Sequence, residues 1–365
     1  LEEARQFVDE TNLQAEAELL EFFEGEGMTI IEPDKQAFID FALDKVLNNE
    51  EMTSTWDMAL FEQIQAAASG EMAMAEEVTG DPVTLTFSSV SVPDDAHTKG
   101  MEVFAEAVNR ISNGNITVEV YPGGQLFTQE GEQAAVRQGN VDMIYSGANW
   151  LAEFVPYMSM FAAPYIFTSY EHMSNTYNGP IGEQIFDDIA NQIGARPLGA
   201  FYLGTREVNL RDIGREVMTP ADMEGVKLRM PNSPTWLFMG EALGANPTPL
   251  AFTEVYLALQ TGTIDGQDNP LPTDLNAKFY EVTKYIVLTD HYINPIFPTI
   301  NEAKWQSLTP SQQQAIKMAL EEARQFVDET NLQAEAELLE FFEGEGMTII
   351  EPDKQAFIDF ALDKV

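Results

Sequence analysis

Two arginines in this sequence occupy positions where a guanidinium could bind an anionic ligand. Arg206 follows the apolar run GAFYLG and Arg229 lies in GVKLRMP, so both are placed at the ends of predicted strands. In open α/β folds ligands bind outside the carboxyl ends of strands, and a guanidinium presents a rigid fork of donors that matches a carboxylate. The two positions therefore predict a carboxylate site. The alternative is a solvated strand face, because apolar residues alternate with Lys227 and Arg229.

A second candidate region follows at residues 246–270. Its centre, FTEVYLALQ, has the apolar spacing of an amphipathic helix and includes Phe252. Asn269 precedes a proline, which favours an extended backbone at that residue. By these patterns alone the helix belongs to a core, and Asp265 and Asn269 are turn residues.

Short apolar strands alternate with helices over most of the chain, and this arrangement would position the arginines. A first series of strands is expected at 83–90, 115–122 and 141–147, with helices at 98–112 and up to Gln138. A second series begins at 196–203 and continues at 225–231 and 285–291. Such alternation predicts βαβ units with parallel sheets. Two series predict two α/β domains.

One long helix is expected near the C-terminus. Thr309 is a favourable N-cap and Pro310 a favourable first helical residue. The apolar periodicity continues to Phe342, and Gly344 and Gly346 end it. Such a helix is about 50 Å long, which makes it a candidate brace across both domains.

Residues 1–46 recur without a change as residues 320–365. A natural repeat diverges, so this identity predicts an engineered chain. Placing 1–69 after residue 319 would give an ordinary uninterrupted protein, which makes 1–69 a permuted C-terminal segment and 70–81 a linker. Residues 320–365 would be the second copy, which continues the long helix. We hypothesise that the two copies compete for one place, as in a switch or sensor.

Composition excludes several classes of partner. The formal net charge of −41 argues against nucleic acid and acidic membrane surfaces. There is no cysteine, and His97, His172 and His291 are isolated from one another. We therefore predict neither a metal site nor a cofactor, and we expect the histidines to be structural or on the surface. Asp95 beside His97 is expected in a polar turn between a strand and a helix.

The longest informative segment is GVKLRMPNSPTWLFMGEALGANPTPLAFTEVYLALQTGTIDGQDNP. It resembles the signature region of TRAP transporter solute-binding proteins of the DctP type, and the resemblance covers the unduplicated chain except the linker. It implies an α/β, two-lobed periplasmic-binding-protein (Venus flytrap) fold that closes on an organic acid, braced by the long helix. It also implies a periplasmic protein that delivers its ligand to TRAP membrane subunits. We expect a monomer, with domain-swapped oligomers as the alternative.

The resemblance also assigns roles to residues. Arg229 is implied as the main carboxylate ligand, with Arg206 as a second contact. Asn269 is expected to hydrogen-bond the same carboxylate, and Phe252 to form an apolar wall. The lobes are expected at 82–203 plus about 292–319 (lobe I) and at 204–291 (lobe II).

The first lobe differs from the sialic acid-binding members of the family. Their polar pocket positions correspond to Val90, Gln129 and Gly147, which argues against sialic acid here. Trp150 falls where the first lobe faces the pocket, and an indole there could stack on a sugar ring. For Trp150 and Trp236 a place in the core is equally consistent with the sequence.

The ligand class stays open between sugar acids, C4-dicarboxylates and related acids. An enzyme acting on an organic acid through Asp265 or Glu153 is an alternative, although no acid–base pair is evident. A further alternative is an engineered scaffold that no longer binds a ligand.

Overall fold

The computed structural model describes residues 23, 28, 41, 45 and 78–364. The chain divides into two units, Leu1–Ala73 and Met74–Val365, and the description below concerns the second. Most of the first copy of the repeat, residues 47–69 of the permuted segment and most of the linker lie outside the described residues. The permutation and the competition between the two copies therefore stay hypotheses.

The first half of the fold contains the expected alternation of strands and helices. Asp95 and Thr128 cap two of its helices through side-chain oxygens, and Gly139 ends one of them with a φ of 74°. The elements are β1 (Val83–Ser88), α5 (Ala96–Ile111), β2 (Ile116–Tyr121), α6 (Gln129–Gln138), β3 (Met143–Ser146), α7 (Ala148–Leu151), η1 (Pro156–Met160), α8 (Tyr170–Tyr177), α9 (Pro180–Ile193), β4 (Ala195–Pro197) and α13 (Glu302–Ser307).

The second half is built from shorter elements. Ser233 caps one helix, and Gly262 ends another in the left-handed conformation. The elements are η2 (Pro220–Met223), β6 (Lys227–Met230), α10 (Pro234–Ala242), β7 (Asn246–Pro249), η3 (Phe252–Glu254), α11 (Val255–Thr261), β8 (Gly266–Pro270), α12 (Leu271–Asn276), η4 (Phe279–Glu281), β10 (Thr348–Ile350) and α15 (Lys354–Leu362).

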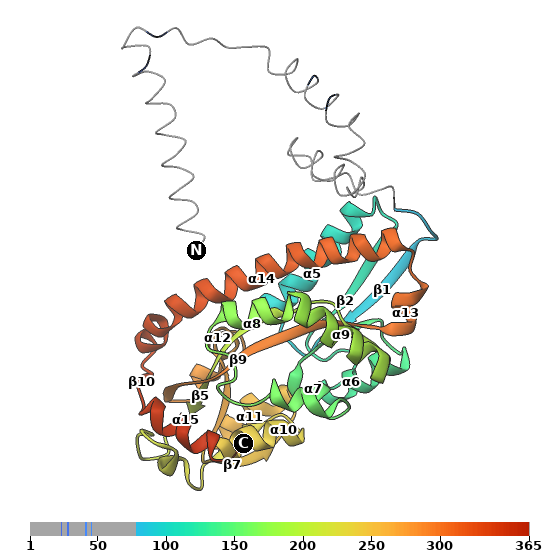
Figure 1. Cartoon of the computed structure of the whole chain (residues 1–365). Helices are drawn as coiled ribbons and strands as arrows, with labels where there is room; N and C mark the ends of the chain where they lie inside the picture. Colours follow the sequence, from blue (N-terminus) through green and yellow to red (C-terminus); the bar gives the residue numbers. More distant parts are fainter. Residues whose placement is uncertain (1–22, 24–27, 29–40, 42–44, 46–77, 365) are drawn as a thin grey trace. The chain divides into compact units, whose positions relative to one another are not determined.

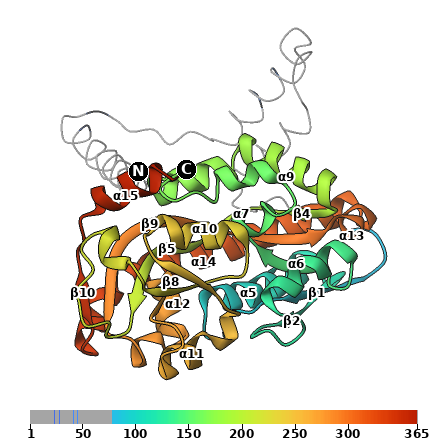
Figure 2. The ribbon, with the colours of Figure 1, turned by 90° about the horizontal axis from the view of Figure 1, so that it is seen from below.

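Two long strands join the halves, β5 (Phe201–Leu210) and β9 (Tyr285–Asn301). The sheet order is β2-β1-β3-β9-β5-β8-β6-β7, with β4 and β10 also paired to β9. Figure 2 shows β1 and β2 at the opposite end of this arrangement from β10.

Pairing is parallel within each half, where β1 pairs with β2 and β3, and β6 pairs with β7 and β8. It is antiparallel where β9 meets β3 and β5, and where β5 meets β8. The prediction of wholly parallel sheets is therefore wrong for segments 196–203 and 285–291. These segments belong to strands that run through both halves rather than to local βαβ units.

The long helix α14 (Pro310–Gly344) begins and ends as predicted (Figure 1). Thr309 and Gln312 form a reciprocal capping box at its start. Its first part joins a cluster with β1 and α5 through Ile316 and Val327. Its last part joins another cluster with α12 and β9 through Phe342. The helix thus packs on both halves, and the second copy of the repeat supplies its C-terminal part together with β10 and α15.

Polar side chains also fasten α14 to β5, at a break in the β5–β9 register. Asp328 accepts a hydrogen bond from the Tyr202 amide at 2.6 Å, and Asn331 donates to the Tyr202 carbonyl at 2.8 Å. Glu335 accepts from the Thr205 amide at 2.5 Å. Asp328, Asn331 and Glu335 are three and four positions apart and so lie on one face of the helix. This face is hydrogen-bonded to residues 202–205 of β5.

Gly204 occupies the centre of this segment with a φ of 134°. A Cβ atom there would lie 2.4 Å from the Pro270 Cβ in the neighbouring strand. Only glycine fits this conformation and this close approach. Arg206 follows two residues later, so the irregular segment fixes where that guanidinium begins.

Each half has its own apolar core. Leu85, Phe104 and Ile316 belong to the first core, and Leu228 and Phe357 belong to the second. Two cores joined by two strands make the fold two-lobed. The predicted lobe boundaries at 203/204 and 291/292 fall inside β5 and β9 and stay predictions. Among the described residues, no helix has the length and apolar character needed to cross a bilayer.

Candidate functional site

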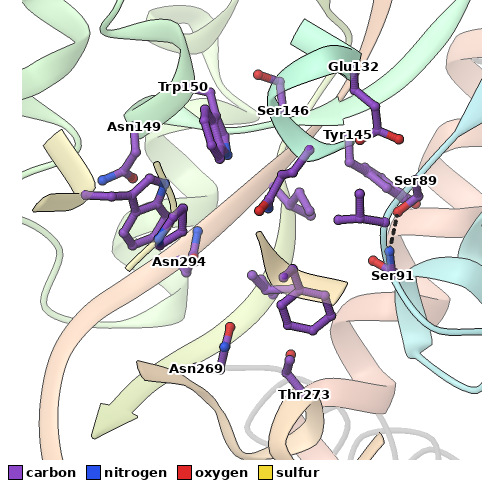
Figure 3. Close-up of a pocket in the computed structure, with 18 of the residues that line it drawn as sticks. Ser89, Ser91, Glu132, Tyr145, Ser146, Asn149, Trp150, Asn269, Thr273 and Asn294 are labelled. Carbon is purple, nitrogen blue, oxygen red and sulfur yellow. Dashed lines mark hydrogen bonds between the residues drawn. The ribbon is translucent and has the colours of Figure 1, made fainter. Parts of the chain in front are cut away.

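A pocket lies between the two lobes, lined by residues of β5, β8 and β9 and by loops of both halves (Figure 3). Its empty space is about 790 Å³, including the part open to solvent, which is within the range of small-molecule sites. All six residues selected from the sequence line it: Trp150, Arg206, Arg229, Trp236, Phe252 and Asn269.

Arg229 is the third residue of β6 and is buried, whereas its neighbour Lys227 is exposed. Its Nε donates to the Leu250 carbonyl at 2.8 Å. Its Nη2 has no hydrogen-bond partner, and no carboxylate within residues 78–364 forms an ion pair with it. Burial lowers the pKa of Arg229 to about 9, against a smaller opposing effect of Asp268. A buried cation without a counter-ion is costly, so this side chain favours an incoming anion.

Arg206 is buried too, but its charge is already paired. Its Nε donates to Asp268 Oδ2 at 2.7 Å, its Nη1 donates to Asn294 Oδ1 at 2.9 Å, and its Nη2 donates to the Asp268 carbonyl and carboxylate. A guanidinium has five N–H donors, so one N–H on Nη1 remains. Its position was predicted at a strand end and is instead in the middle of β5, because the strand continues past the bulge.

Asp268 balances this network. Burial opposes its charge, but Arg206 and a hydrogen bond from His291 outweigh that effect and hold the pKa of Asp268 below its ordinary value. The His291 Nε2 lies 3.1 Å from Asp268 Oδ2. His291, expected to be structural or on the surface, is buried and supports the charge pair. Sequence reasoning overlooked Asp268, although it directly precedes Asn269.

Asn269 and Phe252 lie on the same side of the pocket as Arg229. Asn269 was expected in a turn and instead belongs to β8, where its Nδ2 donates to Gln267 Oε1. The ring of Phe252 lies 5.9 Å from the Arg229 guanidinium carbon and contacts Phe279 edge to face. Phe252 therefore presents an apolar surface beside the unpaired guanidinium.

Trp150 and Trp236 are both buried and both line the pocket, so each belongs to the core and to the site. The Arg206 guanidinium carbon lies 4.6 Å from the Trp236 ring centroid, a cation–π arrangement. In the described part of the chain, Trp236 Nε1 has no hydrogen-bond partner, and neither has Asn149 Nδ2. Together with Arg229 Nη2 these are three buried donors around one pocket, which suits a ligand rich in acceptor oxygens.

The first-lobe side of the pocket has a different character. Its polar side chains are hydroxyls and amides together with two carboxyl groups, those of Asp95 and Glu132; the hydroxyl and amide residues are Ser89, Ser91, Gln129, Ser146 and Asn149. Val90, Gln129 and Gly147 line the pocket, at the positions selected from the sequence. Figure 3 places Glu132 and Ser146 across from Asn269 and Thr273.

Glu132 is a pocket residue that sequence reasoning missed. Burial raises its pKa to about 8, and a hydrogen bond from Ser88 opposes this only in part. Gln129, three residues earlier on α6, was selected as a pocket position. Residues three positions apart lie on the same face of a helix. The spacing of Gln129 and Glu132 could therefore have indicated that Glu132 also faces the pocket.

Of Asp265, Glu153 and Asp95, the acidic residues considered for other chemistry, Asp95 lines the pocket. Asp265 accepts a hydrogen bond from the Lys227 amide at 2.9 Å, and neither Asp265 nor Glu153 lines the pocket. Asp95 caps α5 and accepts from the His97 amide and ring, as expected of a polar turn. Within the described part of the chain, no cluster of three or more His, Cys, Asp or Glu residues could hold a metal ion.

Comparisons with known proteins agree on one family. The DctP model, described as bacterial extracellular solute-binding protein, family 7, matches residues 87–363. The matched span includes the second copy of the repeat. The sialic acid-binding periplasmic protein SiaP of Vibrio cholerae is 32% identical over 256 residues, which cover 70% of this chain and 79% of that protein.

Two solved structures from Roseobacter denitrificans are similar over most of their length. A TRAP periplasmic solute-binding protein with bound 3-deoxy-D-manno-oct-2-ulosonic acid is 41% identical, with a TM-score of 0.74, covering 78% of this chain and 93% of that chain. A second one, with bound L-galactonate, is 35% identical, with a TM-score of 0.73, covering 79% and 94%.

Proposed function

The chain belongs to the bacterial extracellular solute-binding proteins of family 7, and from this premise we propose that its pocket captures a small organic acid for a TRAP transporter. The observation that carries the proposal is Arg229, a buried guanidinium at the pocket that has no carboxylate partner within residues 78–364. A ligand carboxylate would neutralise it and satisfy its free N–H groups.

The other pocket residues have roles that follow from their surroundings. Arg206 contributes its one remaining N–H to the ligand, because Asp268 and Asn294 occupy the others. Asn269 hydrogen-bonds the carboxylate, and Phe252 limits the space beside it. Trp236 offers its unpartnered Nε1 to a ligand oxygen.

Binding is coupled to closure of the lobes. The pocket is lined from both lobes, and the lobes are joined by β5 and β9. When a ligand is bound at Arg229, the first lobe closes onto it, and closure excludes water from the ion pair. The protein acts by binding and release, without turnover.

The setting follows from the relatives. Several are named periplasmic, and two solved relatives hold sugar acids. We therefore place this protein outside the cytoplasm, with a sugar acid or related carboxylate as ligand and TRAP membrane subunits as the receiving partner.

Substitution of Arg229 tests this function. Arg229→Ala lowers the affinity for the carboxylate at least tenfold, because a charge-assisted hydrogen bond contributes about 1.5–3 kcal/mol. Isothermal titration calorimetry with acids found in a thermal-shift screen measures the change. Arg110→Ala, which removes an arginine of an exposed ion pair with Glu322, is the control and binds normally. Equal affinity of the Arg229 variant and the unchanged protein for every acid would refute the proposal.

A further inference from the structure

Glu132 is a buried carboxyl group of the pocket for which the carboxylate-binding mechanism has no role. It lies on α6, on the wall opposite Asn269, and is 2% exposed. Ser88 Oγ donates to its Oε1 at 2.7 Å. Its Oε2 has no hydrogen-bond partner among the described residues. This oxygen is not fully enclosed by protein atoms, and the space it opens to is the pocket.

No cation balances Glu132. The cationic groups that line the pocket are Arg206, which is paired with Asp268, and Arg229, which belongs to the other lobe. Within residues 78–364 no Lys or Arg forms an ion pair with Glu132. A carboxyl group in such surroundings favours its neutral form, and the pKa of about 8 agrees with this.

Within the described residues, the elements around α6 bring no basic side chain to this wall of the pocket, and the other acidic side chain there is Asp95. The helix packs on β3 and β9. The titratable side chain of β3 is Tyr145, whose pKa is raised well above its ordinary value by burial. On β1, Ser88 is the partner. Asp95, also at the pocket, is occupied by the amide and ring of His97.

A neutral carboxyl group both donates and accepts a hydrogen bond, and so does an alcohol. The neighbouring first-lobe side chains, Ser89, Gln129 and Ser146, are also neutral hydroxyls and an amide. A second ligand carboxylate at this wall would lose its hydration without meeting a cation, which is unfavourable.

We infer that Glu132 determines specificity in this pocket: it binds a hydroxyl-bearing, uncharged end of the ligand whose carboxylate lies at Arg229, and it disfavours a second carboxylate there. The ligand class is then a polyhydroxy monocarboxylate rather than a dicarboxylate. This inference rests on the proposed carboxylate site at Arg229.

Matched pairs of acids test the inference. Galactonate and galactarate, gluconate and glucarate, and erythronate and meso-tartrate each differ only in whether the terminal carbon is an alcohol or a carboxylate. Calorimetry at pH 6.5 gives each affinity. The monocarboxylate of the preferred pair binds about 30-fold or more tightly than its dicarboxylate, because the second carboxylate is buried unpaired. Equal affinities within that pair overturn the inference.

Variants then assign the preference to Glu132. Glu132→Ala weakens monocarboxylate binding and leaves dicarboxylate binding nearly unchanged, so the ratio shrinks about tenfold, in line with a lost hydrogen bond. Glu102→Gln, a charge change at an exposed site on α5, keeps the ratio of the unchanged protein. An Ala variant that is folded by circular dichroism and keeps the original ratio overturns the inference.

A pH series gives a readout that does not depend on the Ala variant. If the ligand requires protonated Glu132, affinity falls about fourfold between pH 6.5 and 8.5 for a group with a pKa of about 8. Glu132→Gln keeps a donor and an acceptor but cannot ionise, so its affinity stays level over that interval. Identical pH profiles of the two proteins overturn the inference.

The two proposals fail in different ways. If Arg229→Ala abolishes acid binding but a dicarboxylate such as succinate is the preferred ligand, only the specificity inference is wrong. If no acid in the panel binds in a manner that depends on Arg229, the carboxylate site itself is wrong and the inference falls with it.

Discussion

The two walls of the pocket differ in the charge and hydrogen-bonding groups that they present. The second-lobe wall carries two buried arginines, one paired with Asp268 and one unpaired. The first-lobe wall carries hydroxyl and amide groups, Asp95, which is hydrogen-bonded to His97, and Glu132, whose pKa is raised to about 8 by burial. We propose that one wall recognises the charge of the ligand and that the other recognises its uncharged remainder.

The difference between the two arginines is equally informative. Arg206 belongs to a network with Asp268, Asn294 and His291, in which its charge is paired and four of its five N–H donors are used. Arg229 has a single hydrogen bond, to a backbone carbonyl. A paired buried charge supports the fold, whereas an unpaired one stores unfavourable free energy that a ligand can release.

The largest expected effect concerns the paired charge. Asp268→Asn leaves Arg206 buried without its counter-ion, so it lowers the free energy of unfolding by about 3–5 kcal/mol. Urea denaturation without ligand measures this. Asp212→Asn removes a carboxylate from an exposed pair with Lys284 and serves as the control, with little effect on the free energy of unfolding because water screens the pair. Similar losses in both variants would contradict the distinction between buried and exposed pairs.

A smaller effect of opposite sign is expected at the unpaired charge. Arg229→Met removes an unsatisfied buried cation at similar volume, so the ligand-free protein keeps its stability or gains about 1 kcal/mol. The stabilisation by added ligand disappears in the same variant. Thermal melting with and without the acid measures both. A ligand-free loss as large as that of Asp268→Asn would show that Arg229 supports the fold.

The smallest expected effect is on the neutral wall. Asn149→Ala removes an unpartnered donor, so affinity falls by about threefold to tenfold, the range of one neutral hydrogen bond. Calorimetry on this variant and on Arg229→Ala shows which wall contributes more to the affinity for the ligand. If the asparagine variant lost more affinity than the arginine variant, the division of roles between the walls would be wrong.

Local patterns predicted much of the fold. The capping box at Thr309 and the apolar periodicity to Phe342 fixed both ends of α14. The alternation of strands and helices gave the first three strands and their helices. Pairing direction was not predictable, because a strand's sequence does not show that β9 continues from one lobe into the other.

The site was predicted unevenly for a similar reason. The four residues expected from the family resemblance and the two tryptophans selected beside them meet in one pocket. Asp268 and Asn294 were missed, since their partner Arg206 is 62 and 88 residues away in the chain. The protonation state of Glu132 depends on its burial and on the absence of a basic side chain beside it among the described residues. Only the packed structure shows these surroundings.

The path of α14 has a consequence for the order in which the chain folds. Leu85 and Phe104, near the start of the described residues, share a core with Ile316 and Val327. A chain synthesised from its N-terminus cannot bury that apolar surface until more than 300 residues have left the ribosome. The first lobe therefore completes its core only when α14 is available, and chains truncated before Pro310 expose an apolar surface that favours aggregation.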